Sequence, residues 1–402
     1  MKWEILENNN RGSEMKDFEW YSPTKVIFGN GAADKIGEAA KPYGKKSLLV
    51  YGMSSIKNTG LYERVVSQLQ NAGISVVDFG GVKSNPVLSH VRKGVQLAKA
   101  EGVDFLVAVG GGSVIDTAKA IAVGALTDKD IWDFFTFKAF PEKALPILTL
   151  VTIPASGSEM NINVVITNDE TREKFAFPSE VVYPKVAIMD PSLTFTVSKS
   201  YTAYSAADIF SHVLDVYFTR TAEWTPMQDG IAEGLLRALM QSVDRIMKNP
   251  EDYDARATMM WCATCALNGF IHSGLGFISM PLHILEHPIS ALFDIAHGAG
   301  MSIIIPAWLK ITSEQQPARC AQLARNVFGV VEYDDAKAAD EGIAALKNWF
   351  DSIGAPTSFS AMDISKDGVN NLIETAYNTN QMKIAGVELP REYFAEVYNL
   401  AI

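Results

Sequence analysis

The chain has 402 residues, of which 48% are hydrophobic and 20% are charged, and its formal net charge at pH 7 is −11. This length exceeds what one hydrophobic core usually serves, so we expect at least two domains. The acidic balance argues against nucleic acid or an anionic membrane as the main partner, because a negatively charged surface is repelled by both.

Residues 1–14, MKWEILENNNRGSE, are polar and show no periodicity. A second methionine, Met15, opens the segment MKDFEWYSPTKVIFG, which resembles a natural start. We therefore predict that residues 1–14 are an added leader or a disordered segment outside the fold.

Residues 15–195 alternate short apolar runs with helical patterns. The runs are rich in Val, Ile and Leu, are bounded by Gly, Pro, Asn or Asp, and include KSLLVYG, ISVVDFGG, DFLVAVGGGS, LPILTLVTIPA and KVAIMDP. Helical stretches such as LYERVVSQLQNAG and SHVRKGVQLAKAEG lie between them. This alternation predicts a parallel sheet with helices on its faces, in a Rossmann-like α/β domain.

The turn after one of these runs, in LLVYGMSSIKNTG, contains no Asp or Glu. In dinucleotide-binding folds an acidic residue here hydrogen-bonds the ribose 2′-hydroxyl and repels a 2′-phosphate. If the domain binds a dinucleotide, the lack of this repulsion favours a 2′-phosphate, and hence NADP(H) over NAD(H). The small Gly52, the hydroxyl of Ser55 and the nearby Lys57 favour the same choice. The alternative is a plain βα turn whose Gly and Ser suit its geometry.

A Gly-rich turn lies in GVDFLVAVGGGSVIDTAKAIA, between a predicted strand and a helix that begins near residue 114. Gly111, Gly112 and Ser113 would let the backbone approach a pyrophosphate at the positive end of that helix. The spacing is not that of the G-x-G-x-x-G fingerprint. The alternative is a tight turn with Ser113 as N-cap and Asp116 complementing the helix dipole.

A second Gly and Ser cluster, TIPASGSEMN, follows a later strand. The hydroxyls of Thr152 and Ser156 there could contact the same nucleotide, although Ser and Gly are also common in ordinary turns.

Residues 196–402 show long stretches of helical period, such as YTAYSAADIFSHVLDVYFT and DEGIAALKNWFDSIG. We predict an all-α domain there, a boundary at residues 191–198, and an active site in the cleft between the domains. Cys262 and Cys265 form a C-x-x-C in a buried helical pattern, but no second cysteine pair exists to complete a zinc site. Three cysteines in so long a chain favour a reducing compartment, so we expect a cytoplasmic protein.

Four of the six histidines and one aspartate have spacings that suit a metal site. Asp208 and His212 are four residues apart, His283 and His287 repeat that spacing, and His297 follows. One carboxylate and two or three imidazoles supply the nitrogen and oxygen donors that a borderline divalent cation prefers. The alternative is an amphipathic helix whose histidines are partly exposed.

With both patterns in view, the sequence resembles the iron-containing (group III) alcohol dehydrogenases, and most closely their branch of NADPH-dependent butanol dehydrogenases and aldehyde reductases. The resemblance runs from residue 22 to near the C-terminus and is carried by GGGSVIDTAKA, GSEMN, KVAIMDP, the D-x-x-x-H at 208–212 and HILEHPISALFDIAHGAG. It implies the dehydroquinate synthase-like architecture, with an α/β dinucleotide-binding domain followed by a helical metal-binding domain. It also implies a homodimer and reversible hydride transfer between a nicotinamide and a short-to-medium-chain aldehyde or primary alcohol.

The resemblance also assigns roles to individual residues. The expected ligands of one divalent metal, Fe²⁺ or alternatively Zn²⁺, are Asp208, His212, His283 and His297. His287 matches a histidine that lies beside the substrate without binding the metal. The expected nucleotide contacts, besides the pyrophosphate loop at 111–113, are Asn85, Thr152, Ser156 and Lys174. Asp215 stands where that branch usually has glutamate, and GLGFISMPL stands before His283 where relatives usually carry Gly-Asp-Trp, so substrate preference stays open.

Two other functions remain possible at this stage. A metal- and NAD-dependent lyase similar to dehydroquinate synthase needs a cluster of Lys and Arg for its phosphorylated substrate, but residues 208–216 and 274–300 contain none. A non-catalytic metal or nucleotide sensor would differ from an enzyme in showing no turnover with NADPH and butyraldehyde.

Overall fold

The computed structural model describes residues 14–384 and 389–402. The leader predicted at residues 1–14 therefore lies outside the described residues, except for Glu14. The chain forms two compact units, one built from residues 21–196 and 251–268, the other from residues 14–20, 197–250 and the described part of 269–402.

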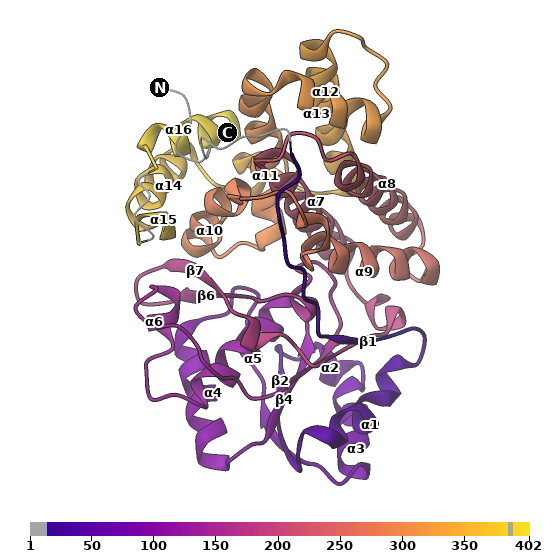
Figure 1. Ribbon diagram of the computed structural model, residues 1–402, viewed down its shortest axis with the longest axis vertical. Helices are drawn as coiled ribbons and strands as arrows, with labels where there is room; N and C mark the ends of the chain where they lie inside the picture. The colour runs from indigo at the N-terminus through magenta and orange to yellow at the C-terminus, as the bar shows by residue number, and fades with distance from the viewer. Residues whose placement is uncertain (1–13, 385–388) are drawn as a thin grey trace. The chain divides into compact units, whose positions relative to one another are not determined.

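The first unit contains a six-stranded parallel sheet, as the alternating sequence pattern predicts (Figure 1). The order across the sheet is β1-β8-β5-β4-β2-β3. The strands are β1 (Lys25–Phe28), β2 (Lys46–Tyr51), β3 (Ser75–Phe79), β4 (Phe105–Gly110), β5 (Ile147–Val151) and β8 (Val186–Met189). A separate antiparallel pair is formed by β6 (Asn163–Asn168) and β7 (Glu173–Pro178).

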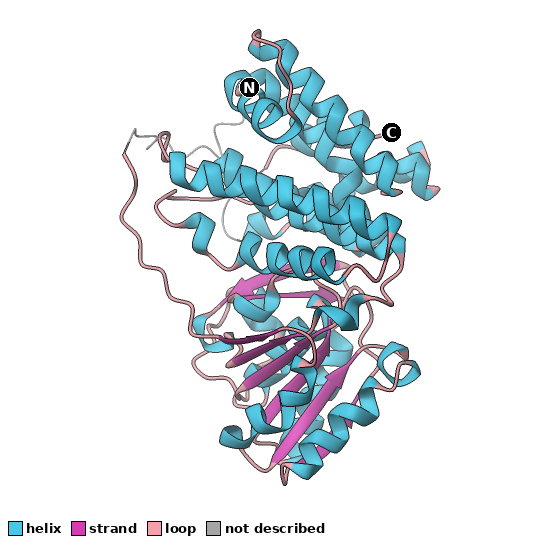
Figure 2. Ribbon diagram, turned by 90° about the vertical axis from the view of Figure 1, so that its right-hand side faces the viewer, coloured by secondary structure: helices cyan, strands magenta, loops and turns pink. Residues whose placement is uncertain are grey.

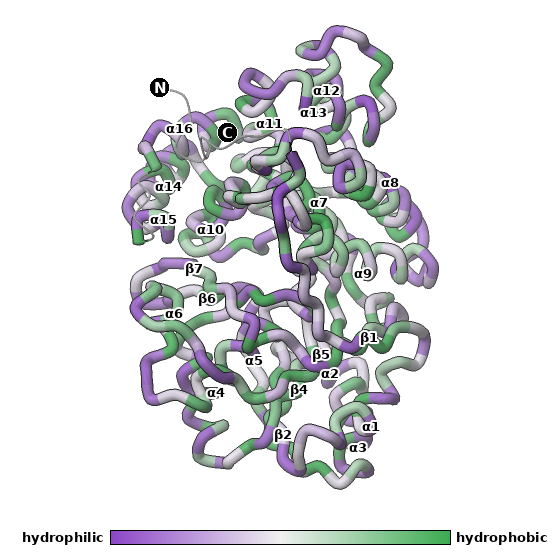
Figure 3. The backbone as a smooth tube through the Cα atoms, viewed as in Figure 1, coloured by the Kyte–Doolittle hydropathy of each residue, from purple (hydrophilic) through white to green (hydrophobic). Residues whose placement is uncertain are grey.

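Helices cover both faces of this sheet, and each face has its own apolar core. Along β2, Leu48 and Val50 belong to one core while Leu49 belongs to the other, because successive side chains of a strand point to opposite faces. One core includes residues of α4 (Leu88–Glu101) and α5 (Gly112–Gly124), and the other includes residues of α1 (Ile36–Ala40) and α3 (Leu61–Asn71). Strands buried on both faces read as continuous apolar runs, which Figure 3 shows in green. The short helices α2 (Ser55–Asn58) and α6 (Trp132–Phe135) lie in connections.

The second unit is helical, as predicted, and its described residues contain no strand (Figure 2). Its helices are α7 (Lys199–Thr219), α8 (Pro226–Lys248), α10 (Pro281–Phe293), α11 (His297–Gln315), α12 (Pro317–Phe328), α13 (Asp335–Ile353), α14 (Lys366–Thr379), α15 (Gln381–Ile384) and α16 (Arg391–Leu400). Helices α7 and α11 approach closely at Gly298, where a Cβ atom would lie 2.0 Å from the carbonyl oxygen of Tyr204. Only glycine allows this contact, which brings the start of α11 against α7.

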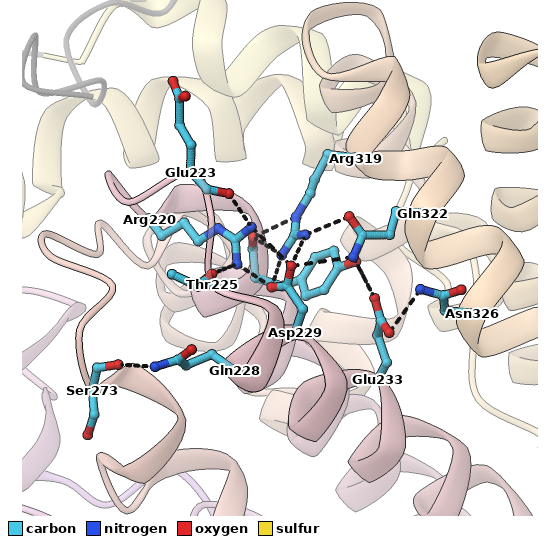
Figure 4. A network of polar contacts seen from close by, with 11 residues as sticks. Arg220, Glu223, Thr225, Gln228, Asp229, Glu233, Ser273, Arg319, Gln322 and Asn326 are labelled. Carbon is cyan, nitrogen blue, oxygen red and sulfur yellow. Dashed lines mark hydrogen bonds and ion pairs between the residues drawn. The ribbon is translucent and has the colours of Figure 1, made fainter. Parts of the chain in front are cut away.

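A polar network joins the end of α7 to α8 and α12 in this unit (Figure 4). Asp229 accepts hydrogen bonds from Arg319 at 2.6 and 2.7 Å and a further ion-paired bond from Arg220. The Arg319 guanidinium lies 3.3 Å from the centroid of the Tyr217 ring, whose hydroxyl donates to Glu233 at 2.8 Å. Asp229 is therefore paired with two opposite charges, and the Glu233 carboxylate is hydrogen-bonded, which lowers the cost of burying these groups.

The compact units differ from the predicted domain boundaries in two places. Helix α9 (Tyr253–Leu267) belongs to the α/β unit, although it lies inside the predicted helical domain at 196–402. Thr264 on α9 donates a 2.5 Å hydrogen bond to the buried Glu159, and a Cβ atom at Gly157 would lie 2.9 Å from the carbonyl oxygen of Ala263. Residues 15–20 pack with the helical unit, where Lys16 N donates to the Gly274 carbonyl at 2.9 Å.

Within the residues that the structure describes, no helix combines the length and the apolar character needed to cross a membrane.

Candidate active site

Several predicted nucleotide-binding residues lie at one edge of the six-stranded sheet. Gly52 follows β2, Gly111 follows β4 and Thr152 follows β5. These strands are neighbours and run parallel, so their carboxyl ends meet at the same edge. After β2 the chain adds β3 on one side, and after β4 it adds β5 on the other side. The strand order therefore reverses between β2 and β4. Open α/β sheets bind dinucleotides at such a reversal.

The Gly-rich turn between β4 and α5 packs tightly against the second predicted cluster. Gly111 is the N-cap of α5, and a Cβ atom at Gly112 would lie 2.3 Å from Ser156 Oγ. Ser113 is not the N-cap; its hydroxyl donates to the carbonyl of Ser84 instead. The turn therefore requires glycine for packing. The amino end of α5 has no side-chain cap, so its backbone N–H groups suit a phosphate.

Buried polar contacts fix three further predicted residues. Asp116 accepts hydrogen bonds from Ser158 Oγ at 2.6 Å and from Val165 N at 3.1 Å. Burial outweighs these contacts and raises the pKa of Asp116 to about 6. Lys174 Nζ donates to Asn85 Oδ1 at 3.4 Å, and both side chains are buried. Asp116 thus ties α5 to the Ser158 turn, and its direct contact with a nucleotide stays a prediction, as do those of Asn85 and Lys174.

The turn after β2 is not crowded around Gly52. A Cβ atom at Gly52 would have its nearest neighbour at 3.7 Å, and Ser55 is exposed at the start of α2. Lys57, which the sequence placed near a phosphate, lies instead over the rings of Tyr51 and Tyr62, at 5.0 and 4.6 Å from their centroids. The predicted contact of this turn with a 2′-phosphate therefore depends on its small and hydroxyl-bearing residues and stays a prediction.

In the helical unit, three of the predicted metal ligands come together from three helices. Asp208 lies on α7, His283 near the start of α10, and His297 is the first residue of α11. One donor atom of each lies within 4.8 Å of the others, and His297 Nε2 is 3.4 Å from Asp208 Oδ1. Because metal–ligand bonds are about 2.0–2.2 Å long, one cation can contact donor atoms that lie this close together.

The state of His283 shows that a cation fits this site. Its Nε2 atom is buried and has no hydrogen-bond partner among residues 14–384 and 389–402. A buried polar nitrogen without a partner is costly, and coordination to a metal would satisfy it. Asp208 and His297 supply the other oxygen and nitrogen donors that Fe²⁺ or Zn²⁺ would require.

His212 and His287 lie next to these three residues. His212 Nε2 is 3.6 Å from Asp208 Oδ1, and its ring stacks on His283 with centroids 4.8 Å apart. Burial holds the pKa of His212 well below its usual value, which keeps the ring neutral, as a metal ligand must be. The His287 ring lies 6.1 Å from His283 and 5.8 Å from His297. The predicted roles of both residues stay predictions.

Asp215 orients His283, a role that the sequence did not reveal. Its Oδ2 is 2.6 Å from His283 Nδ1, and its Oδ1 accepts from Leu282 N at 2.9 Å. An ionised carboxylate only accepts, so Nδ1 carries the proton and Nε2 is left to bind metal. Burial lowers the pKa of His283, but the bond to Asp215 and the nearby negative charges outweigh it, so the pKa is raised overall.

Glu286 has the corresponding contact with His297 and was also not predicted. Its carboxylate accepts hydrogen bonds from His297 Nδ1 and from Ser290 Oγ. The signal available in the sequence was a single acidic residue in the apolar stretch between His283 and His287, with no Lys or Arg from 274 to 300. Only the fold shows that this carboxylate points to the third helix.

The thiols of the C-x-x-C motif do not form a reactive pair. Burial raises the pKa of Cys262 to about 12 and that of Cys265 to about 11, so both stay protonated at neutral pH.

Comparison with known families matches both halves of the chain. Residues 23–191 match the model described as "Iron-containing alcohol dehydrogenase", and residues 202–400 match "Fe-containing alcohol dehydrogenase family, C-terminal". The chain is a member of the iron-containing alcohol dehydrogenase family. The family predicted from the sequence motifs is thereby confirmed, together with its two-part fold.

Relatives of this alcohol dehydrogenase cover almost its whole length. The probable NADH-dependent butanol dehydrogenase 1 of Bacillus subtilis is 44% identical over 90% of this chain and 94% of its own. The NADPH-dependent aldehyde reductase YqhD of Escherichia coli is 35% identical over 88% and 90%. The crystal structure of NADH-dependent butanol dehydrogenase A from Thermotoga maritima has a TM-score of 0.93 at 42% identity, covering 97% of this chain and 100% of that one.

Proposed function

We propose that this alcohol dehydrogenase interconverts short-to-medium-chain aldehydes and primary alcohols, with one divalent metal and a nicotinamide coenzyme. The observation that carries the proposal is the convergence of Asp208, His283 and His297, with two imidazoles held by carboxylates through Nδ1. The metal supplies Lewis acidity toward a carbonyl oxygen, a contribution of several kcal/mol. This substrate class is supported by the relatives, since the Bacillus subtilis protein is named a probable butanol dehydrogenase and the Escherichia coli protein an aldehyde reductase.

The residues of the chain would divide the remaining work. Asp208, His212, His283 and His297 would hold the cation, while the residues at the β2, β4 and β5 edge would hold the coenzyme. His287 would pass the alcohol proton toward solvent, a role that suits an imidazole close to the ligand group. Hydride transfer itself is the chemistry of the nicotinamide.

The test is turnover of the metal-loaded protein with an aldehyde series that includes butyraldehyde, followed through absorbance of the reduced nicotinamide. The His283→Ala protein is the matched control, since it keeps the coenzyme-binding unit unchanged. The proposal is supported if the unmodified protein oxidises coenzyme in an aldehyde-dependent manner and the His283→Ala protein does not. Binding of coenzyme without turnover on any aldehyde would favour a sensor instead. Metal analysis of the same sample decides between Fe²⁺, which the family description favours, and Zn²⁺.

For the coenzyme, we propose NADPH in preference to NADH. The support is the Gly52 turn, which lacks an acidic side chain and is not crowded at residue 52. The relatives differ here, since the Bacillus subtilis protein is described as NADH-dependent and the Escherichia coli protein as NADPH-dependent. Comparing kcat/KM for the two coenzymes tests the proposal, and equal or NADH-favouring values would overturn it.

We also propose that the protein is a homodimer. Met15, Trp224 and Met227 are 49%, 73% and 59% exposed and line a hollow of about 480 Å³ together with Pro226 and Gln228. Exposed apolar side chains gathered in one place commonly mark a protein contact. Light scattering of the purified protein measures the mass, and a monomeric mass at micromolar concentration would refute the proposal.

A further inference from the structure

A fully buried carboxylate of α10 contacts one of the proposed metal ligands but is not itself a proposed ligand. Glu286 has no exposed surface, and its two oxygens accept hydrogen bonds from His297 Nδ1 and Ser290 Oγ. Burying an ionised carboxylate costs several kcal/mol unless its oxygens are hydrogen-bonded or paired with charge. These contacts offset that cost and at the same time tie the imidazole of α11 to α10.

The packing around Glu286 fixes where its carboxylate lies. A Cβ atom at Gly300 would approach Glu286 Oε1 to 2.5 Å, so the first turn of α11 accepts the carboxylate only because residue 300 is glycine. Helix α11 begins at His297, and the positive end of its dipole favours a negative charge beside this turn. The carboxylate therefore has a defined position relative to the His297 ring.

The contact also fixes the proton of His297. An ionised carboxylate accepts and cannot donate, so the Nδ1 atom that faces Glu286 carries the hydrogen. The Nε2 atom, 3.4 Å from Asp208 Oδ1, is then the unprotonated nitrogen, the one that can donate a lone pair to a cation. Carboxylate partners of this kind hold the ring orientation of a metal-binding histidine and strengthen it as a donor.

We propose that Glu286 is a positioning residue of the metal centre, which holds the His297 imidazole so that Nε2 faces the cation and thereby sets metal affinity. The proposal rests on the proposed metal site. Glu286 is better suited to isolate this effect than Asp215, because Asp215 also accepts from the backbone at Leu282 N. His212 Nδ1, in contrast, has no hydrogen-bond partner in the part of the chain described, so its ring lacks such a restraint.

The test compares metal affinity of the full chain with Glu286→Gln and Glu286→Leu, by competition of Co²⁺ and Zn²⁺ against a chromophoric chelator. We expect Glu286→Leu to bind about 10- to 100-fold more weakly, and Glu286→Gln to lose about tenfold, since the amide oxygen still accepts from Nδ1–H but carries no charge. The visible spectrum of bound Co²⁺ should change in Glu286→Leu and be largely restored in Glu286→Gln, which a purely structural role would not produce.

Two controls make the result decisive. Glu233→Gln alters a carboxylate bound by Tyr217, Gln322 and Asn326, away from the histidines, and should leave metal affinity unchanged. His297→Ala removes the ligand itself. If both Glu286 variants bind metal as tightly as the unmodified protein while His297→Ala does not, the positioning role is wrong and the metal site stands. If His297→Ala also binds normally, the proposed metal site is itself wrong. If Glu286→Leu does not fold, the Glu286→Gln affinity decides alone, and an unchanged value overturns the proposal.

Discussion

Replacing Asp215 with asparagine keeps the size of a fully buried side chain and removes its charge. In the protein, Oδ1 accepts from Leu282 N at 2.9 Å and Oδ2 faces His283 Nδ1 at 2.6 Å. Asparagine offers one acceptor oxygen and one donor amide at these two positions. The backbone N–H of Leu282 can only donate, so the side-chain oxygen of asparagine must accept its hydrogen bond. The amide then faces His283 Nδ1 and forces the imidazole proton to Nε2.

That tautomer places a hydrogen on the nitrogen assigned to the metal. We therefore expect metal to bind Asp215→Asn about 10- to 100-fold more weakly. This corresponds to about 1.4–2.8 kcal/mol, at roughly 1.4 kcal/mol for each factor of ten. Independently, a hydrogen bond to a charged group contributes about 1.5–3 kcal/mol to stability, so the variant should also unfold at a lower temperature without metal.

The assay is chelator competition on Asp215→Asn, with Asp215→Glu as the control that keeps the charge. Glutamate at this position should retain the Nδ1–H tautomer and most of the affinity. An Asp215→Asn protein with unmodified metal affinity would refute the tautomer argument. A loss of affinity in Asp215→Glu equal to that in Asp215→Asn would show that geometry, and not charge, controls the site.

His283→Ala should contain almost no metal by mass spectrometry and lose activity, and full metal content would overturn the ligand assignment. His287→Ala should keep its metal while kcat falls about 10²- to 10⁴-fold, whereas metal loss would make His287 a ligand. Gly52→Asp should shift kcat/KM toward NADH, because a Cβ atom fits there and the carboxylate repels a 2′-phosphate; an unchanged coenzyme ratio counts against it. Burial raises the pKa of Asp229, but hydrogen bonds from Arg319 and Arg220 bring it below its usual value. The stability that the ionised Asp229 carboxylate contributes is therefore present above about pH 3.9, the pKa of an unperturbed aspartate. It is lost as the pH falls through the lower pKa of Asp229 in the folded protein. Asp229→Asn should cost about 3 kcal/mol in urea unfolding at pH 7, and much less at the acid end; an equal cost at both pH values would contradict this.

Local patterns in the sequence were sufficient for the two-part fold. Continuous apolar runs bounded by Gly, Pro and Asp identified the parallel strands, since strands buried on both faces cannot alternate with polar residues. The change to a helical period after residue 196 identified the second unit. The i,i+4 spacing of Asp208 with His212 pointed to a metal site because neighbours on one helix face are determined by the helix alone. The motifs in these segments then identified the family.

Tertiary structure decided what depends on contacts between distant segments. The sequence contains Glu286 and Asp215, but only the packing of α7, α10 and α11 shows that each carboxylate faces the Nδ1 atom of a different histidine. Helix α9 has an ordinary helical pattern, and its place in the α/β unit depends on the Thr264–Glu159 bond across 105 positions of sequence. Lys57 follows the Gly52 turn closely, yet its side chain lies over Tyr51 and Tyr62. Periodicity and spacing describe one element at a time, whereas the direction of a side chain across an interface depends on how the elements pack.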